Sequence, residues 1–190
     1  MISVFEYITI LISIILGLGI TKLLAGFATM IVRIRHCNLY WPHILFIILA
    51  FLIHIQDWFV TYELRTIDKW NLPLFLFIIL YPVTLYLLSY MLFPLKYGNH
   101  QYDFKNFFMM NYERIYSLLI VLVILSILQN IYIFHYQWKE QIIQIIISIA
   151  LIFILVFKLN KSLVHKSLAF MLLTFFIISI IFQWNTLIIL

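Results

Sequence analysis

Long, nearly uncharged apolar runs recur along this chain, and they limit the folds open to it more than any other feature. The first run, from Val4 to Val32, contains only Glu6 and Lys22 as charged residues. About twenty apolar residues are enough to cross the hydrocarbon core of a bilayer as a helix. Lipid offers the backbone no hydrogen bonds, and a helix satisfies its own N–H and C=O groups within one segment. The sequence therefore predicts an all-α, polytopic transmembrane helical bundle.

Composition supports this prediction and excludes a soluble domain. Hydrophobic residues make up 66% of the 190 residues and charged residues only 10%, against roughly 25% charged residues in soluble domains. A soluble fold of this length has too much surface for its volume to hide so many apolar side chains. The four glycines and four prolines are too few for the many turns of a transmembrane β-barrel.

We expect one transmembrane domain over residues 1–190, because no linker or charge run divides the chain. Six spans are predicted at about residues 4–32, 40–62, 72–93, 115–134, 141–157 and 167–186. The division between the last two rests on five polar residues that a lipid-facing run would not tolerate. These are Lys158, Asn160, Lys161, His165 and Lys166.

The longest predicted loop, about residues 95–114, contains Phe104, Phe107 and Phe108 at helical spacing. This pattern is typical of a short helix that lies in the membrane interface. An aromatic-rich connector is the alternative.

Lysine and arginine are shared unequally between the two sides of the predicted bundle. Eight fall in loops one, three and five: Arg33, Arg35, Lys96, Lys105, Arg114, Lys158, Lys161 and Lys166. Three fall in the other loops: Arg65, Lys69 and Lys139. The positive-inside rule then places loops one, three and five in the cytoplasm and both termini on the outer side. This basic rim is expected to attract anionic lipids, whereas no recognition element for nucleic acid is visible.

Lys22 is the one basic residue inside a predicted span. It shares a helical face with Gly19 and Gly26, and Gly17 belongs to a second stripe of small residues on the same helix. Small residues allow a neighbouring helix to approach closely, so the first span is expected to be a packed, central helix. Lys22 either lines a polar cavity or extends its ammonium toward the cytoplasmic face.

His54 and Asp57 lie three residues apart on one face of the second span. Such a pair relays protons or binds a cation, because each group alters the proton affinity of the other. The alternative is a satisfied pair near the outer surface. Two ligands fall short of the three or four that zinc requires, so no metal is predicted.

Other polar residues fall in the outer half of the predicted bundle. Glu6 either complements the N-terminus of the first helix or joins a polar vestibule that opens outward. The candidate members of that vestibule are Glu6, His54, Asp57, Gln129 and Gln183. Pro82, inside the third span, is the strongest candidate for a helix kink.

No sequence motif of an enzyme is present. The chain lacks G-x-S-x-G, H-E-x-x-H and a P-loop, and spacing suggests no pair of nucleophile and base. We therefore expect no enzymatic activity, no catalytic residue and no cofactor.

Several short motifs in the first hundred residues carry a resemblance. They are Phe5-Glu6-Tyr7-Ile8, Ser13-Ile14-Ile15-Leu16-Gly17-Leu18-Gly19-Ile20-Thr21, Leu23-Leu24-Ala25-Gly26, Tyr40-Trp41-Pro42-His43, Asp57-Trp58-Phe59, Glu63-Leu64 and Trp70. In these motifs the chain resembles an uncharacterised family of small bacterial polytopic membrane proteins. Members of that family usually carry a second aromatic residue where this chain has Asp57. In size and span layout the chain also resembles the accessory membrane proteins of type VI-B CRISPR loci.

Our leading hypothesis is a non-enzymatic, multi-pass protein of the bacterial inner membrane. It would act as a homo-oligomeric channel or membrane-perturbing protein, with an accessory role in antiviral defence as one form of this function. A small proton-coupled transporter is the first alternative. A membrane scaffold that binds a cytoplasmic protein partner through loop three and the basic rim is the second.

Overall fold

The computed structural model describes residues 3–95 and 102–183, with side chains up to residue 181. Within these ranges it contains six long helices: α1 (Val4–Val32), α2 (Trp41–Val60), α3 (Leu72–Met91), α4 (Phe104–Tyr132), α5 (Ile142–Val156) and α6 (Ser162–Gln183). Short 3-10 helices and two short strands complete it: η1 (Ile34–His36), β1 (Cys37–Asn38), η2 (Thr61–Thr66), β2 (Tyr102–Asp103) and η3 (Trp138–Gln141). The predicted all-α fold is confirmed. Together with the adjoining η2 and η3, the six helices are long and apolar enough to cross a membrane, which indicates a multi-pass membrane protein.

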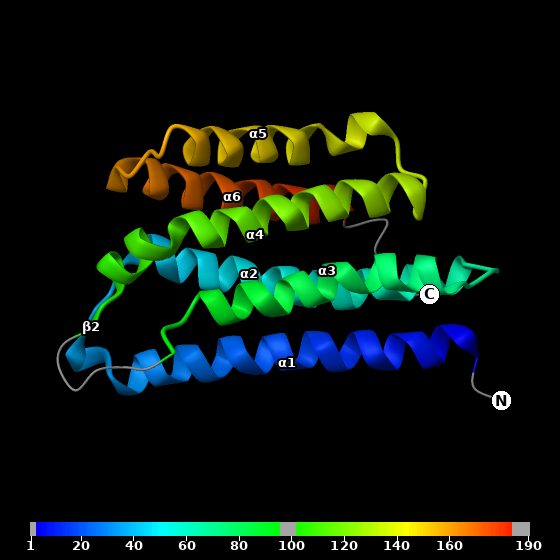
Figure 1. Ribbon diagram of the computed structural model, residues 1–190, viewed down its shortest axis with the longest axis horizontal. Helices are drawn as coiled ribbons and strands as arrows, with labels where there is room; N and C mark the ends of the chain where they lie inside the picture. The colour runs from blue at the N-terminus through cyan, green and yellow to red at the C-terminus, as the bar shows by residue number, and fades with distance from the viewer. Residues whose placement is uncertain (1–2, 96–101, 184–190) are drawn as a thin grey trace.

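The helices run side by side, with α1 along one edge and α5 along the opposite edge (Figure 1). Helix α1 packs mainly against α3, α3 against α4, α5 against α4 and α6 against α2. The C-terminal ends of α1, α3 and α5 and the starts of α2, α4 and α6 lie toward the left-hand end of Figure 1. We call this the basic end, because its described part carries seven Lys and Arg residues: Arg33, Arg35, Lys105, Arg114, Lys158, Lys161 and Lys166.

Local side chains set where several helices begin. Ser3 and Glu6 form a capping box at the start of α1, in which each side chain bonds the other residue's backbone N–H. The Asn71 side chain accepts a hydrogen bond from Leu74 N–H at the start of α3. The Asp103 carboxylate accepts from Lys105 N–H at the start of α4. Each cap satisfies N–H groups that the first turn of a helix leaves free.

The helix that contains the fourth predicted span is longer than that span. Helix α4 is continuous from Phe104 to Tyr132, so it starts before residue 115. Among the described residues of the predicted loop, 104–114 belong to α4 itself and not to a separate interfacial helix. Phe104 and Phe108 are fully buried against α2, where Phe108 stacks on Phe46 with ring centroids 5.4 Å apart. The helix extends this far because Asp103 caps it there and its aromatic side chains find a partner helix.

The predicted division between the last two spans corresponds to a break between helices. Helix α5 ends at Val156, Lys158 adopts a left-handed conformation with φ 47°, and α6 begins at Ser162. The start of α6 lies ahead of the predicted residue 167, because His165 is fully buried and packs into the bundle.

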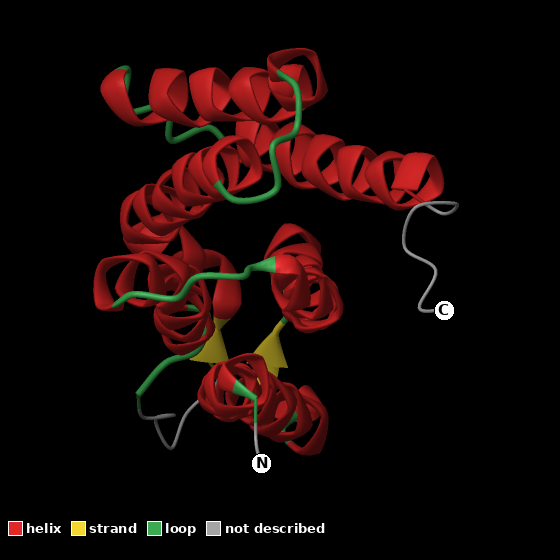
Figure 2. Ribbon diagram, turned by 90° about the vertical axis from the view of Figure 1, so that its right-hand side faces the viewer, coloured by secondary structure: helices red, strands yellow, loops and turns green. Residues whose placement is uncertain are grey.

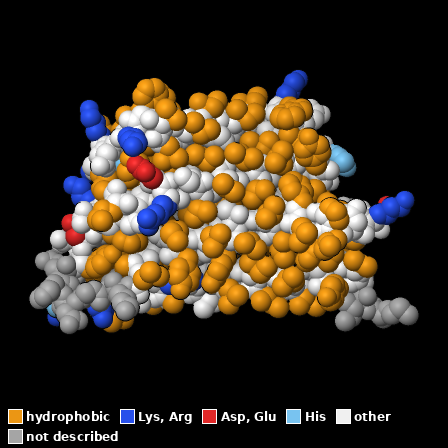
Figure 3. Space-filling model, in the orientation of Figure 1, with side chains coloured by type: hydrophobic (Ala, Val, Ile, Leu, Met, Phe, Trp, Pro, Cys, Tyr) orange, Lys and Arg blue, Asp and Glu red, His pale blue; other side chains and the backbone are white. Residues whose placement is uncertain are grey.

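Burial is uneven between the helices. Among the described residues of α5, only Leu151 and Ile154 are buried. Among the described side chains of α6, Leu172 is the last buried one, and the helix then extends away from the bundle (Figure 2). The face seen in Figure 3 carries a broad hydrophobic middle, with charged side chains toward its ends. This distribution suits a molecule whose middle lies in hydrocarbon.

Candidate functional site

His54 lies at the junction of α1, α2 and α3, fully buried. Its Nδ1 is 2.7 Å from the Ala50 carbonyl oxygen, and its Nε2 is 3.2 Å from the Ser89 hydroxyl of α3. A carbonyl oxygen only accepts, so Nδ1 carries a proton. In the neutral ring Nε2 can only accept, so the single Ser89 hydroxyl proton is shared between Nε2 and the Leu85 carbonyl, which lies 3.0 Å away. We call this group of His54, Ser89 and the opposing Gly19 the middle junction.

Of the three predicted packing glycines, two permit close contacts. A Cβ atom on Gly19 would overlap the His54 ring, and one on Gly26 would overlap the Phe93 ring. Gly17 lies on an exposed part of α1 with open space beside it. Gly19 therefore makes room for the middle junction, whereas Gly17 does not pack inside this copy.

The predicted pair of His54 and Asp57 is not formed. Both ring nitrogens of His54 are engaged by Ala50 and Ser89, so neither is left for Asp57. The half-buried Asp57 carboxylate interacts electrostatically with the Tyr81 hydroxyl of α3 instead. The two residues share a helix face, but their side chains have different neighbours.

Lys22 does not extend freely toward the basic end. It is half-buried, and its ammonium lies 4.1 Å from the centroid of the Tyr90 ring of α3. Such a cation–π contact is worth roughly 0.5–2 kcal/mol, depending on how well water is excluded. It gives the charge a partner at the edge of the middle junction.

Gln129 of α4 hydrogen-bonds the backbone carbonyl that Pro82 leaves without a partner in α3. Proline has no N–H, so the carbonyl of Ile78, four residues earlier, loses its helical partner. The Gln129 side-chain amide donates to that Ile78 carbonyl at 3.2 Å and to the Phe77 carbonyl at 3.1 Å. Helix α3 continues through Pro82, with its free carbonyl capped from α4.

The predicted outward vestibule is not assembled by the described residues. Glu6 is exposed and held in the capping box of α1, and Gln129 is held by α3. The side chain of Gln183 lies outside the described residues. Glu6, His54 and Gln129 are therefore distributed among separate contacts within the bundle.

A second buried polar group, which the sequence did not indicate, lies toward the basic end. His43 of α2 and His165 of α6 are both fully buried and lie against the Phe108 ring, with centroids 5.8 and 5.5 Å away. His43 also contacts Phe104 and Phe107. His165 Nδ1 is 2.8 Å from the Tyr116 hydroxyl. We call these six residues the basic-end cluster. The helical spacing of the phenylalanines was the available signal, but it did not reveal which histidines they pack against.

Three imidazole nitrogens of the basic-end cluster are buried without hydrogen-bond geometry to any described group. They are both nitrogens of His43 and Nε2 of His165. The Leu92 backbone interacts with His43, but not within that geometry. An unsatisfied buried polar atom costs about 1–3 kcal/mol, so this cluster holds its histidines by aromatic packing.

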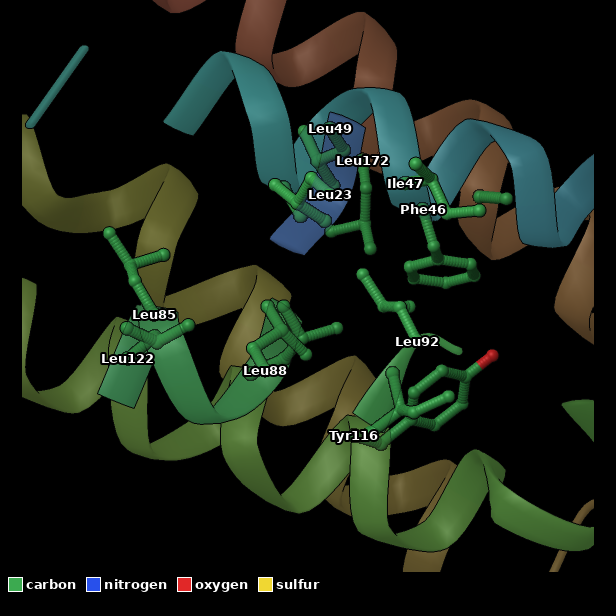
Figure 4. Packing of buried hydrophobic residues seen from close by; sticks show 14 of the residues in the cluster. Leu23, Phe46, Ile47, Leu49, Leu85, Leu88, Leu92, Tyr116, Leu122 and Leu172 are labelled. Carbon is green, nitrogen blue, oxygen red and sulfur yellow. The ribbon is translucent and has the colours of Figure 1, made fainter. Parts of the chain in front are cut away.

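Apolar side chains fill the section between the middle junction and the basic-end cluster. Figure 4 shows them directed into a shared space between helices. They include Leu23, Phe46, Ile47, Leu88 and Leu92, each at most 3% exposed. Buried apolar side chains therefore separate the two polar groups, and we call them the apolar layer.

Loop one and loop three meet at the basic end. β1 and β2 pair in parallel, with Cys37 opposite Tyr102. Burial raises the pKa of the Cys37 thiol, which the Arg33 guanidinium partly offsets. Burial, and then the neighbouring Cys37, raises the pKa of Tyr102. Among the described residues no group of three His, Cys, Asp or Glu side chains is placed to hold a metal ion.

No protein-family model, curated protein or solved structure shows significant similarity to this chain. The resemblance of its N-terminal motifs to a bacterial family therefore stays a prediction.

Proposed function

We propose that this chain is a non-enzymatic, multi-pass protein of the bacterial inner membrane that works as a homo-oligomer to permeate ions or to perturb the bilayer. The observation that carries the proposal is the apolar layer of buried side chains between the middle junction and the basic-end cluster. Ions need a continuous polar or water-filled path, and packed Leu23, Leu88 and Leu92 close the interior of one copy. Any path then forms where copies meet.

Helix α1 offers a surface for a second copy. Gly17 and Thr21 are exposed one turn apart, and the Thr21 hydroxyl is satisfied by the Gly17 carbonyl at 2.7 Å. Small residues on a lipid-facing helix allow another helix to approach closely, with packing rather than a hydrophobic force as the gain. This surface is separate from Gly19, which is used inside the copy.

The proposed orientation puts the basic end in the cytoplasm and both termini outside. The seven described Lys and Arg residues at the basic end, against Arg65, Lys69 and Lys139 at the other, support it. In a Cys37→Ser background, Tyr7→Cys and Lys161→Cys place single thiols at opposite ends. A membrane-impermeant maleimide added to intact spheroplasts should label only the first. Labelling of Lys161→Cys alone would reverse the orientation.

The function is tested by purifying the protein into liposomes. We expect ion flux or dye release that scales with the protein-to-lipid ratio, and native mass measurements that give an oligomer. Gly17→Leu should reduce both oligomer and flux while the protein stays helical. A monomer that produces neither flux nor leakage would refute the proposal.

A small proton-coupled carrier is the second candidate, because the middle junction joins three helices through one histidine. His54 is fully buried and is hydrogen-bonded to Ser89 on another helix, as expected of a group that moves a proton during a conformational change. This function predicts saturable, pH-gradient-driven uptake that His54→Leu abolishes. Flux that is linear in ion gradient and unaffected by His54→Leu would favour the oligomeric channel. A scaffold role at the basic end stays a further alternative, which in-cell crosslinking tests.

A further inference from the structure

A groove between α3 and α4 opens on the surface near the basic end. Its volume is about 490 Å³. Helix α3 contributes Leu87 and Met91, and α4 contributes Glu113, Arg114, Ser117 and Leu118. The groove thus joins an apolar floor to two opposite charges.

The groove lies at the depth of lipid headgroups. Helix α4 has 29 residues and is about 43 Å long at 1.5 Å per residue, which exceeds a hydrocarbon core of about 30 Å. Its first part, up to Arg114, carries all of its charged residues, and no charged residue follows from Ile115 to Tyr132. Glu113 and Arg114 therefore mark the boundary between headgroups and hydrocarbon. Leu118 lies about one turn deeper.

Both charges are available to a ligand. Glu113 and Arg114 are exposed. Glu113 meets the Tyr112 hydroxyl at 3.5 Å, and Arg114 meets the Asn111 side chain at 3.5 Å, both long for hydrogen bonds. The Ser117 hydroxyl donates to the Glu113 backbone carbonyl at 2.8 Å, so it is not free to donate to a phosphate.

We propose that this groove binds a phospholipid whose headgroup carries both a phosphate and a primary ammonium, the chemistry of phosphatidylethanolamine. The Arg114 guanidinium pairs with the phosphate through charge-assisted hydrogen bonds. The Glu113 carboxylate accepts from the ammonium, and an acyl chain lies along Leu87, Met91 and Leu118. Phosphatidylglycerol should bind less well because it offers Glu113 no ammonium and brings a net negative charge. Phosphatidylcholine should also bind less well because its quaternary ammonium has no N–H to donate to Glu113.

Native mass spectrometry with equal amounts of phosphatidylethanolamine, phosphatidylglycerol and phosphatidylcholine tests the proposal. The wild-type protein should prefer phosphatidylethanolamine by roughly fivefold, the ratio for about 1 kcal/mol at an exposed charge pair. Glu113→Gln should abolish the preference over phosphatidylglycerol. Arg114→Gln should weaken the binding of all three lipids. Circular dichroism confirms that each variant stays helical.

Two matched variants control for a general loss of charge. Lys105→Gln removes an exposed cation from the same helix outside the groove, and Asp68→Asn removes an exposed carboxylate near the opposite end. Both should keep the wild-type preference. Equal binding of the three lipids to the wild-type protein, or a loss of preference in Asp68→Asn equal to that in Glu113→Gln, would overturn the proposal.

Discussion

Two buried histidines on α2 differ in their surroundings: one is hydrogen-bonded and the other is packed among aromatic rings. His43 and His54 are both fully buried on α2, roughly three turns or 16 Å apart, and so lie on the same face. Both nitrogens of His54 have hydrogen-bond partners, whereas neither nitrogen of His43 has one within the described structure. His43 packs instead among Phe104, Phe107 and Phe108.

The difference shows what each region depends on. The middle junction depends on position, because Ser89 and the bare Cα of Gly19 must both face the imidazole. The basic-end cluster depends on shape and area, because its aromatic rings gain by contact from many sides. Changing a single atom or group should therefore destabilise the middle junction. The basic-end cluster should lose stability only when a substitution reduces the volume of its side chains.

The sharpest test of the middle junction is Gly19→Leu. The side chain would meet the His54 ring, and overpacking of this kind costs about 3 kcal/mol. Thermal unfolding in detergent, followed by circular dichroism, measures the loss. Gly17→Leu on the same helix is the control when both variants are compared as detergent-solubilised monomers, since Gly17 has open space beside it within one copy. In that form it should change stability by less than about 1 kcal/mol. Equal losses in the two variants would mean that the junction is not closely packed.

Replacing each histidine by leucine tests the comparison directly. His54→Leu removes two hydrogen bonds and should cost about 2 kcal/mol. His43→Leu keeps a similar volume and removes two unsatisfied nitrogens, so its effect should lie within about 1 kcal/mol of zero. The same unfolding assay measures both variants. If His43→Leu is the more destabilising, then His43 is held by a hydrogen bond and not by aromatic packing alone.

The sequence predicted the helices well and their contacts poorly. Apolar run length located all six helices, and Lys158 to Lys166 indicated the last break correctly. His54 was singled out as a buried polar group, but its partner Ser89 lies on another helix, and no spacing rule reveals contacts between helices. The same limit explains Asp57, whose carboxylate interacts electrostatically with Tyr81 on another helix, α3.

Residues of one type were also indistinguishable before the fold was known. Gly17 and Gly19 belong to two stripes of small residues on the first span, and the sequence did not show which stripe packs inside the bundle; only Gly19 faces α2. His43 follows Trp41 and Pro42, a pattern that is typical of a membrane interface, and so it was not recognised as buried. Local chemistry predicts elements, whereas the partner of a side chain depends on how elements pack.

The contact between Gln129 and the Ile78 carbonyl also depends on position, because Pro82 lacks the N–H that would otherwise bond that carbonyl. Gln129→Leu should cost about 1 kcal/mol, because it frees the Ile78 carbonyl that Pro82 leaves without a partner. In a Pro82→Ala background the alanine N–H can bond that carbonyl, so Gln129→Leu should cost much less. A double-mutant cycle by thermal unfolding measures this coupling. Additive effects would show that Gln129 and Pro82 act independently.

The smallest effect is expected where water competes, at the contact between Tyr136 and Glu63. The Tyr136 hydroxyl donates to the Glu63 carboxylate at 3.1 Å, but Tyr136 is 38% exposed. Burial, and then the Glu63 charge, raises the pKa of Tyr136 to about 12, above its unfolded value of about 10. The contact therefore stabilises the fold fully below pH 10 and is lost as the pH rises from 10 to 12.

Comparing wild-type protein with Tyr136→Phe isolates the stability contributed by this contact, because all other tyrosines titrate equally in the two proteins. The stability difference between wild-type and Tyr136→Phe protein should be constant up to about pH 10 and should shrink above it. Urea unfolding at a series of pH values measures that difference. A difference that stays constant to pH 11.5 would mean that Tyr136 is not held by Glu63. Because this contact is exposed to water, removing it should cost less stability than removing the buried contact between His54 and Ser89. The reverse order would contradict the interpretation that the middle junction is the most position-dependent polar contact in the described chain.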